Sequence, residues 1–442
     1  MSTVRDRVVR RVDEMEDEIL EHASELIRVE SVNPKYPGTV YDDVVGGEGK
    51  AARQVAEIWK AAGAEIDLFA VEPGRENAVG VFKGTGRGRS LIMNGHVDTV
   101  PVGNVSDWAD GQPFSGRVDS ERIWGRGAAD QKCGVIAQAM AVAALAREGV
   151  RLHGDLIMEA VVGEEVMDHE CGVSATIRRG YRADAAIVSE PTAPPGSLSV
   201  VPVSPGLLWF SVTVIGKASH ASVRDEMIRA GGAGSAIAVN AIEKGIRIMA
   251  AIRDLEEEWG ITKRHPLFKP GHFTIHPGVI TGGPYGVLVP FIISQFCTIE
   301  YACWFPPDDD PEAVKAEIAT HITRAAELDS WLRQNPPRID WKLHWPALNT
   351  PAAEPIVEAV SRAHRVAVGS DAPLGGGEVA GFCAVCDAAF LSLAGIPSVV
   401  YGPGSILQAH TVDEWVSKAD VVTAAKTFAI VAMAWCGTSG GS

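Results

Sequence analysis

Acidic and imidazole side chains follow three predicted strands of this chain, at the point where each strand ends. The strand SLIMNGHVD ends in His96 and Asp98, DLIMEAVVGEE ends in Glu164 and Glu165, and DAAIVSE ends in Glu190. In open α/β sheets the carboxyl ends of parallel strands meet at one edge, and ligands bind there. Carboxylates that converge repel each other unless a cation balances their charge. The pattern therefore predicts a metal centre at this edge of a sheet.

Two further candidate ligands lie in glycine-rich segments. Asp130 follows the sequence GRGAA just before an Ala-rich stretch, and it could instead be the N-cap of the helix that begins there. His410 lies in YGPGSILQAHTVDEW after another predicted strand, and it could be an ordinary loop histidine. We favour the ligand interpretation for both because the other candidates are expected at the same sheet edge.

The spacing within the two pairs suggests different tasks for their members. His96 and Asp98 are two residues apart, so their side chains point the same way, and a carboxylate often fixes the tautomer of a metal-binding histidine. Glu164 and Glu165 are adjacent and point to opposite sides of an extended chain, so one can bind metal while the other faces a substrate. Taken alone, each pair could also be a hydrogen-bonded loop or a solvated acidic turn.

Composition limits the class of protein. The chain has 442 residues, enough for two domains, and is 46% hydrophobic and 22% charged, as in ordinary soluble proteins. A net charge of −16 disfavours a nucleic-acid or anionic membrane partner, and we expect no signal peptide and no membrane span. Seven scattered cysteines predict a reduced, cytoplasmic protein, in which the C-x-x-C of Cys383 and Cys386 is interpreted as two small buried hydrophobes.

The order of predicted elements indicates an α/β fold with an inserted domain. Helical and strand patterns alternate from residue 5 to about 204, which predicts a mostly parallel sheet covered by helices. The next segment reads β-α-β-β-α-β, with helices at 230–259 and 310–328, which is the order of a ferredoxin-like unit. We therefore expect a metal-binding catalytic domain of residues 1–205 and 349–442, and an inserted lid or dimerisation domain of residues 206–348.

The candidate residues and their flanking motifs resemble the M20 family of metallopeptidases and amidohydrolases, which includes acetylornithine deacetylase and succinyl-diaminopimelate desuccinylase. The resemblance covers nearly the whole chain. It depends on the motifs GHVDTVP (95–101), GRGAADQKCG (125–134), GEE (163–165), SEP (189–191), GKASHAS (216–222), GPG (402–404) and AHTVDEW (409–415).

The resemblance implies two divalent ions that share Asp130 as a bridging ligand. His96 and Glu190 would complete the set of one ion, and Glu165 and His410 would complete that of the other. Relatives mostly use zinc, and some use cobalt or manganese; a mixed nitrogen and oxygen donor set suits zinc without excluding the others.

The resemblance also implies roles for three further side chains. Asp98 would orient His96, Glu164 would be the general base, and His220 in the inserted domain would reach a partner subunit's site and stabilise the oxyanion in a homodimer. The implied reaction is hydrolysis of the amide C–N bond of a small N-acyl compound, with water activated between the two cations and Glu164 accepting its proton.

Three segments differ from those that many relatives use to bind α-amino-acid derivatives. Val287-Leu288-Val289-Pro290 replaces N-x-(I/V)-P, Ala302-Cys303-Trp304 replaces D-x-R, and Cys386-Asp387-Ala388-Ala389-Phe390 replaces T-D-A-R-F. Arginine pairs bidentately with a carboxylate, and neither alanine nor tryptophan can do so. The departures disfavour an acyl-amino-acid substrate and favour a flatter or aromatic one, such as an N-formyl or N-acyl heteroaromatic amine. Alternatively, Trp304 only packs within the inserted domain.

Other functions stay open at this point. The same metal site could deaminate an aromatic amine hydrolytically, or the protein could be a dipeptidase or carboxypeptidase, which would need a carboxylate anchor. A non-catalytic binding protein on the same scaffold is the alternative from a different class, and it would have no need of a base such as Glu164.

Overall fold

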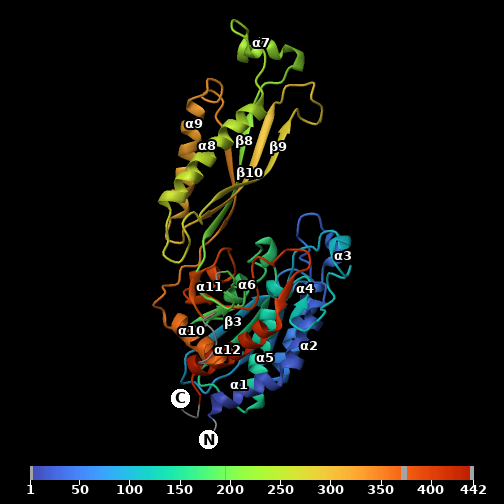
Figure 1. Ribbon diagram of the computed structural model, residues 1–442, viewed down its shortest axis with the longest axis vertical. Coiled ribbons are helices and arrows are strands. Elements are labelled where there is room, and N and C mark those ends of the chain that lie inside the picture. Colours follow the sequence, from blue (N-terminus) through green and yellow to red (C-terminus); the bar gives the residue numbers. More distant parts are fainter. Residues whose placement is uncertain (1–2, 195, 370–375, 439–442) are drawn as a thin grey trace. The chain divides into compact units, whose positions relative to one another are not determined.

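The chain divides into two compact units, each with its own sheet (Figure 1). The computed structural model describes residues 3–194, 196–369 and 376–438. Unit 1 consists of Met1–Val203, Leu348–Phe382 and Cys386–Ser442, and unit 2 consists of Ser204–Ala347 and Cys383–Val385. The main divisions lie one or two residues from the domain boundaries predicted at 205/206 and 348/349.

Unit 1 is built around an eight-stranded sheet. Its strands, in spatial order, are β1 (Glu65–Ala70), β2 (Glu76–Phe82), β5 (Leu156–Val161), β3 (Leu91–His96), β6 (Ala186–Val188), β13 (Ser398–Val400), β7 (Val200–Val203) and β12 (Val379–Gly381). Strand β3 pairs in parallel with β5 and β6, and β6 pairs in parallel with β13. The predicted α/β fold with a mostly parallel sheet is confirmed, and the three strands that precede the candidate ligands are neighbours.

Helices bury one face of this sheet. Leu91 and Met93 of β3, and Leu156 and Met158 of β5, lie in the main hydrophobic core. Side chains alternate along a strand, so His96 faces the opposite side. The helices that contribute to this core are α1 (Val4–Glu14), α2 (Glu16–Ile27), α4 (Gly47–Ala61), α5 (Cys133–Arg147), α10 (Pro355–Val368) and α12 (Lys418–Cys436). Shorter elements of unit 1 are α3 (Tyr41–Val44), α6 (Val173–Arg178), α11 (Ala388–Leu393), and the strands β4 (Arg122–Trp124) and β14 (Trp415–Ser417), which pair with each other.

One helix corrects the expectation that no segment approaches a membrane span. Helix α12 is 19 residues long, and its length and apolar composition would allow it to cross a membrane. In the structure 67% of its most apolar window is buried, and α12 packs against α1, α5 and α10. Its apolar character is therefore that of a core helix, which must be hydrophobic on several sides because it contacts helices on several sides.

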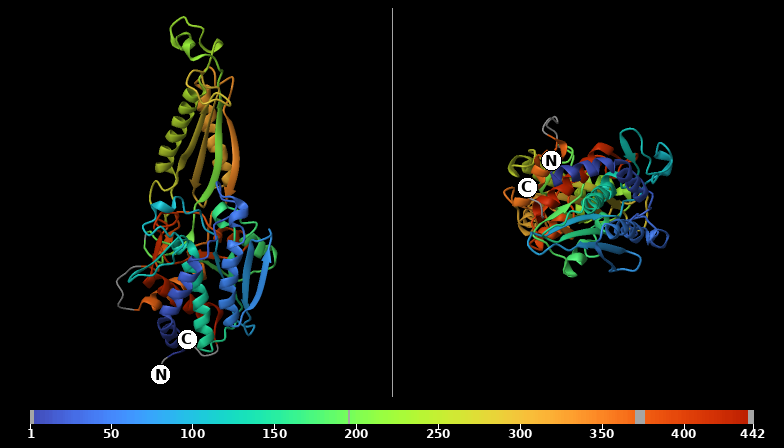
Figure 2. Two further views of the ribbon diagram at one scale, coloured as in Figure 1. Left: turned by 90° about the vertical axis from the view of Figure 1, so that its right-hand side faces the viewer. Right: turned by 90° about the horizontal axis from the view of Figure 1, so that it is seen from below.

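Unit 2 has a four-stranded antiparallel sheet in the order β11-β8-β10-β9. In chain order its elements are β8 (Gly206–Ile215), α7 (Arg224–Ile228), α8 (Ala241–Thr262), β9 (Ile275–Gly283), β10 (Phe296–Phe305), α9 (Pro311–Glu327) and β11 (Arg338–Trp345). Helices α8 and α9 contact each other beside this sheet (Figure 2), and they share a core with Phe210, Ile299 and Tyr301. The predicted β-α-β-β-α-β order is confirmed.

The helix predicted at 230–259 begins later than expected. Helix α8 begins at Ala241, where Asn240 accepts hydrogen bonds from the backbone N–H groups of Ile242 and Glu243. The preceding segment contains Gly231 and Gly234, both with positive φ. A left-handed backbone interrupts a right-handed helix, so the apolar spacing before residue 241 could not extend it.

Candidate metal centre

Side chains from three separate motifs surround His96 at the carboxyl end of β3. Its Nε2 atom lies 3.0 Å from Oδ1 of Asp130, 3.5 Å from Oε1 of Glu190 and 4.0 Å from Oε2 of Glu164. His96, Asp130 and Glu190 are buried. Because β3, β5 and β6 are adjacent, the residues that follow them reach the same point, as the sequence predicted.

The second carboxylate oxygen of Asp130 faces a different pair of residues. Its Oδ2 atom lies 3.4 Å from Nε2 of His410, and the same His410 nitrogen lies 2.9 Å from Oε2 of Glu165. His96, Asp130 and Glu165 each offer one donor atom, and these three atoms lie within 4.8 Å of one another. Asp130 therefore has one oxygen toward His96 and Glu190 and the other toward His410 and Glu165.

The charges of this group fit the binding of divalent cations. Burial raises the pKa of Glu164, Glu165 and Glu190, that of Glu165 to about 7, and the neighbouring Asp130 adds to each increase. Burial lowers the pKa of His410, but its bonds to Asp130 and Glu165 outweigh this effect and raise that pKa to about 11. Oε1 of Glu165 is buried without a hydrogen-bond partner among the described residues. Cations at this point would balance the carboxylates and leave the histidines neutral, as metal ligands must be.

Asp98 connects the two glutamates to the end of β3. Its carboxylate accepts hydrogen bonds from the backbone N–H groups of Gly163 at 3.0 Å and Glu165 at 3.1 Å. It also accepts one from Nδ2 of Asn33 at 2.8 Å. Nδ1 of His96 lies 3.0 Å from the carbonyl oxygen of Asp98 and 3.6 Å from its carboxylate. The contact to His96 thus runs mainly through the backbone, while the carboxylate holds the segment that carries Glu164 and Glu165.

Several polar contacts at the centre involve residues that the sequence did not identify. The buried Glu414 accepts the backbone N–H groups of Ala129 and Asp130 at 2.8 and 3.1 Å, and its other oxygen accepts Nη1 of Arg126 at 2.5 Å. Nε2 of Gln131 donates to Oε1 of Glu190 at 2.5 Å. Their closeness in sequence to candidate ligands could have indicated both residues, since Glu414 is four residues from His410 and Gln131 is adjacent to Asp130.

His220 belongs to unit 2, whereas the candidate ligands belong to unit 1. Its side chain is exposed, and Nδ1 lies 2.7 Å from Oγ of Ser222. The backbone of His220 forms an isolated antiparallel β-bridge with that of Ile292. His220 therefore lies next to the segment that contains Val287-Leu288-Val289-Pro290. Its part in catalysis stays a prediction.

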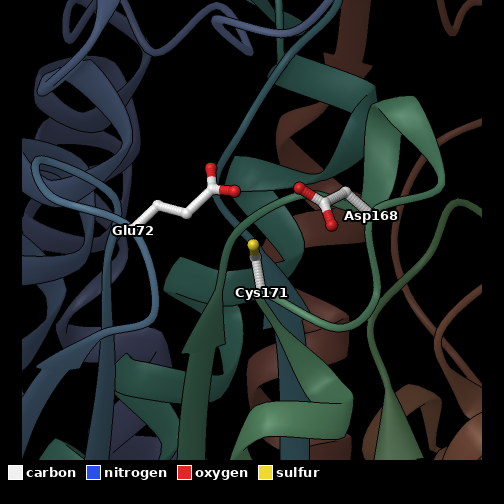
Figure 3. A group of neighbouring side chains, drawn as sticks. All are labelled: Glu72, Asp168 and Cys171. Atoms are coloured by element: carbon white, nitrogen blue, oxygen red, sulfur yellow. The ribbon is translucent and has the colours of Figure 1, made fainter.

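A second group in unit 1 has the spacing of a metal site but a different charge balance. Glu72 approaches Asp168 and Cys171, which lie three residues apart in one loop (Figure 3). Nζ of Lys35 lies 2.5 Å from Glu72 and 2.8 Å from Asp168, and Nη1 of Arg75 lies 3.1 and 2.9 Å from the same two carboxylates. Burial and a hydrogen bond to Asp168 raise the pKa of the Cys171 thiol to about 12, so it stays protonated. This group is an ion-pair network that already contains its cations.

A mostly parallel sheet with histidine and carboxylate donors at its edge, joined to a ferredoxin-like unit, is the arrangement of a metal-dependent hydrolase. The model of peptidase family M20/M25/M40 matches residues 92–434, and the chain belongs to this family. The predicted family and enzyme class are therefore confirmed. M20 hydrolases act on C–N bonds and use divalent metal ions, generally two.

Two curated relatives match this chain from end to end. It is 33% identical to the N-formyl-4-amino-5-aminomethyl-2-methylpyrimidine deformylase of Bacillus subtilis strain 168, over 97% of this chain and 96% of the relative. It is 30% identical to the deformylase of the same name from Halalkalibacterium halodurans, over 98% of both chains.

Solved structures of peptidases share the fold. Human carnosine dipeptidase 1 matches with a TM-score of 0.72 at 14% identity, over 98% of this chain and 99% of that one. A tripeptidase from Staphylococcus aureus matches with a TM-score of 0.69 at 18% identity, over 95% and 98%. At these identities the likeness concerns the fold alone.

Proposed function

We propose that this protein is a deformylase that hydrolyses the N-formyl amide of an aminomethyl-substituted aminopyrimidine or a closely related heteroaromatic amine. The observation that carries the proposal is the end-to-end similarity, at 30% and 33% identity, to two deformylases of such a compound. The products would be formate and the free amine.

Donors of unit 1, three of them buried, supply the proposed metal ligands. His96 and Glu190 would hold one divalent ion, Glu165 and His410 the other, and Asp130 both, since its two oxygens lie beside the two pairs. Two histidines with three carboxylates suit zinc, which is the ion we propose. Divalent ions bound there would polarise the formyl carbonyl and bring the pKa of a water molecule toward neutrality.

Glu164 is the proposed base, because it lies beside the ligands and its neighbour Glu165 faces His410 instead. Its carboxylate would accept a proton from the attacking water and deliver it to the nitrogen of the departing amine. Asp98 would keep Glu164 in reach through its bonds to the backbone of Gly163 and Glu165. In the proposed homodimer, His220 would donate a hydrogen bond in the partner subunit's site to the oxygen that becomes negative during attack.

The composition of β10 supports an uncharged aromatic substrate. Ala302 and Trp304 are half-buried, and they alternate with inward-facing residues, so both lie on the face of the unit 2 sheet that bears Glu300. Trp209 of β8 is the register partner of Ala302 and is 46% exposed. Two tryptophans near an alanine offer flat apolar surface, whereas the arginine of many relatives would offer a carboxylate anchor.

Two further parts of the proposal concern assembly and location. Strand β9 is at an edge of the unit 2 sheet and exposes Val279 and Ile280, so a second copy could pair there, and we propose a homodimer formed through unit 2. All seven cysteines are free thiols, six of them buried, which supports the reducing cytoplasm.

A substrate panel tests the proposal. The purified protein would be loaded with zinc, cobalt or manganese and assayed with N-formyl and N-acetyl aminomethylpyrimidines, N-succinyl-diaminopimelate and dipeptides. We expect the highest kcat/KM for the N-formyl pyrimidine, with one formate released per amine, and loss of turnover after chelation. A higher kcat/KM for dipeptides would contradict the proposal, and so would release of ammonia from the ring amine, which is the deaminase outcome.

A further inference from the structure

We propose that Lys35 and Arg75 are positioning residues for the segment that carries Glu164 and Glu165. This segment, residues 162–171, is called the glutamate loop below. The inference rests on the proposed function for the roles of the two glutamates. The contacts that hold the loop belong to unit 1 alone and do not depend on a bound metal.

The two ends of the glutamate loop are joined by one buried side chain. Oδ1 of Asn77 accepts the backbone N–H of Val162 at 3.1 Å, and Nδ2 of Asn77 donates to the carbonyl oxygen of Cys171 at 2.8 Å. Asn77 is fully buried. The loop thus starts and ends at a fixed point on β2, and the open question is what determines the conformation of the residues between.

The middle of the loop has little regular structure to hold it. Glu164–Val166 form a single short turn, between Gly163 and Met167, which both have positive φ. The adjacent carboxylates of Glu164 and Glu165 face a centre that already contains Asp130 and Glu190. No helix or strand longer than the short turn fixes residues 163–167, so an attraction to side chains outside the loop is needed to hold their conformation.

Asp168 provides that attraction on the outer side of the loop. Its Oδ2 accepts hydrogen bonds from Nζ of Lys35 at 2.8 Å and Nη1 of Arg75 at 2.9 Å. Its backbone N–H donates to the carbonyl oxygen of Gly163 at 2.8 Å, which joins Asp168 to the residue just before the two glutamates. Charge-assisted bonds of this kind are the strong ones.

Arg75 is itself rigidly held. Its Nε and Nη2 atoms donate to the two oxygens of Glu48 at 2.6 and 2.9 Å, and both side chains are fully buried. A bidentate pair of this kind fixes the plane of the guanidinium group. Asp168 therefore binds to a cation that cannot follow the loop if the loop moves.

Lys35 connects the outer and inner contacts of the loop. Its backbone N–H donates to Oδ1 of Asn33 at 3.0 Å, and Nδ2 of Asn33 donates to the Asp98 carboxylate that also holds Gly163 and Glu165. One short segment, residues 33–35, thus contacts Asp168 in the loop and Asp98, which holds Gly163 and Glu165. The ion pairs of Asp168, whose side chain is drawn in Figure 3, would set the position of the glutamates relative to Asp98.

The test replaces Lys35 and uses Lys263 as a matched control. Lys35→Met removes a lysine, with a side chain that is 36% exposed, that bridges Glu72 and Asp168. Lys263→Met removes a lysine of unit 2 that bridges Asp309 and Glu317 at 2.7 and 3.0 Å. Arg75→Met would leave Glu48 buried without a partner and could fail to fold, so Asp168→Asn serves as the second variant.

Three measurements would be made on the wild type and the variants. Hydrogen exchange of residues 163–168 in the metal-free protein reports the order of the loop, zinc titration calorimetry reports affinity, and steady-state assays separate kcat from KM. For Lys35→Met and Asp168→Asn we expect loop exchange about 10-fold faster, zinc affinity about 10-fold weaker, and kcat about 10-fold lower with KM changed less than about twofold. Lys263→Met should match the wild type in all three.

The outcomes separate this inference from the proposed function. If hydrogen exchange of the loop and zinc affinity in Lys35→Met and Asp168→Asn equal those of Lys263→Met, the positioning role is wrong, whatever the substrate. Faster exchange and weaker zinc binding without any deformylase activity in the wild type would support the positioning role and contradict the proposed function.

Discussion

Unit 1 contains two groups of acidic side chains that resemble metal sites by distance, and they differ in what surrounds them. Around Asp130, carboxylates approach His96 and His410, and Glu165 retains a buried oxygen without a hydrogen-bond partner among the described residues. Around Asp168, the carboxylates contact the permanent cations Lys35 and Arg75. The first group pairs its carboxylates with histidines, which bind metal when neutral, whereas the second pairs them with permanently charged side chains.

The comparison teaches that spacing of donors alone does not define a metal site. A neutral histidine can bind a metal ion. The side chains of lysine and arginine remain positively charged and neutralise the carboxylates that they contact. Removing charge from the first group should therefore change metal binding, and changing the thiol of the second should not.

The largest effect should come from exchanging the adjacent glutamates for their amides. Glu165→Gln weakens a predicted ligand, so we expect loss of bound metal together with turnover, measured by elemental analysis and by the deformylase assay. Glu164→Gln should keep both ions and lose about 10²–10⁴-fold in kcat, because the proposed base is gone. Near-native turnover of Glu164→Gln would show that another group is the base.

Metal binding should also stabilise the fold. Ions that bind only the native state add about 3 kcal/mol to the free energy of unfolding when their free concentration is about 100 times Kd. We expect this as an increase of about 5 °C or more in Tm. The measurement is thermal unfolding of the chelated protein with and without zinc. Asp130→Asn should show a much smaller increase, because it alters the residue that faces both halves of the centre. An equal increase in that variant would place the ions elsewhere.

Glu159 provides a third comparison, because its buried carboxyl bonds to a neutral group. Glu159 of β5 bonds to the neutral amide of Asn94 at 2.9 Å, and burial raises its pKa to about 7. The native state then binds a proton more tightly than the unfolded chain, so this group makes the protein less stable as the pH increases from about 4.5 to 7. Glu159→Gln should reduce that loss by about 1–3 kcal/mol, measured by denaturant unfolding at both pH values. An unchanged pH dependence would mean that Glu159 is ionised throughout.

The smallest effect is expected at the second acidic group. Cys171→Ser should leave the metal content, the zinc affinity and kcat unchanged, because Lys35 and Arg75 neutralise the carboxylates beside it. Elemental analysis before and after dialysis against zinc checks this. Loss of one equivalent of metal in the variant would show that the second group binds a metal ion despite its contacts with Lys35 and Arg75.

Much of the fold and the convergence of the candidate ligands could be predicted because the signals are local. Apolar strands that end in His96, Glu165 and Glu190 are readable in short windows, and parallel strands bring their carboxyl ends together by geometry. The start of α8 was missed although Asn240 and the preceding glycines mark it, because apolar spacing continues past a backbone that cannot be helical. The length and apolar composition of α12 could be recognised in the sequence, but its burial could not.

The contacts that hold the ligands could not be predicted in the same way. Arg126 meets Glu414, and Lys35 meets Asp168, across long stretches of sequence with no pattern to connect them. Asn77 likewise joins the two ends of the glutamate loop from another strand. Such pairs depend on the path of the whole chain.

The amino-acid sequence by itself determined the family, the α/β fold with a ferredoxin-like segment, and the residue types that can bind metal, since each of these is written in short motifs and periodic patterns. Only the tertiary structure decided which acidic group contacts the protein's own permanent cations and which contacts histidines. The physical reason is that the attraction between charges depends on the distance between them and on the burial of both, and neither quantity exists until the chain has folded.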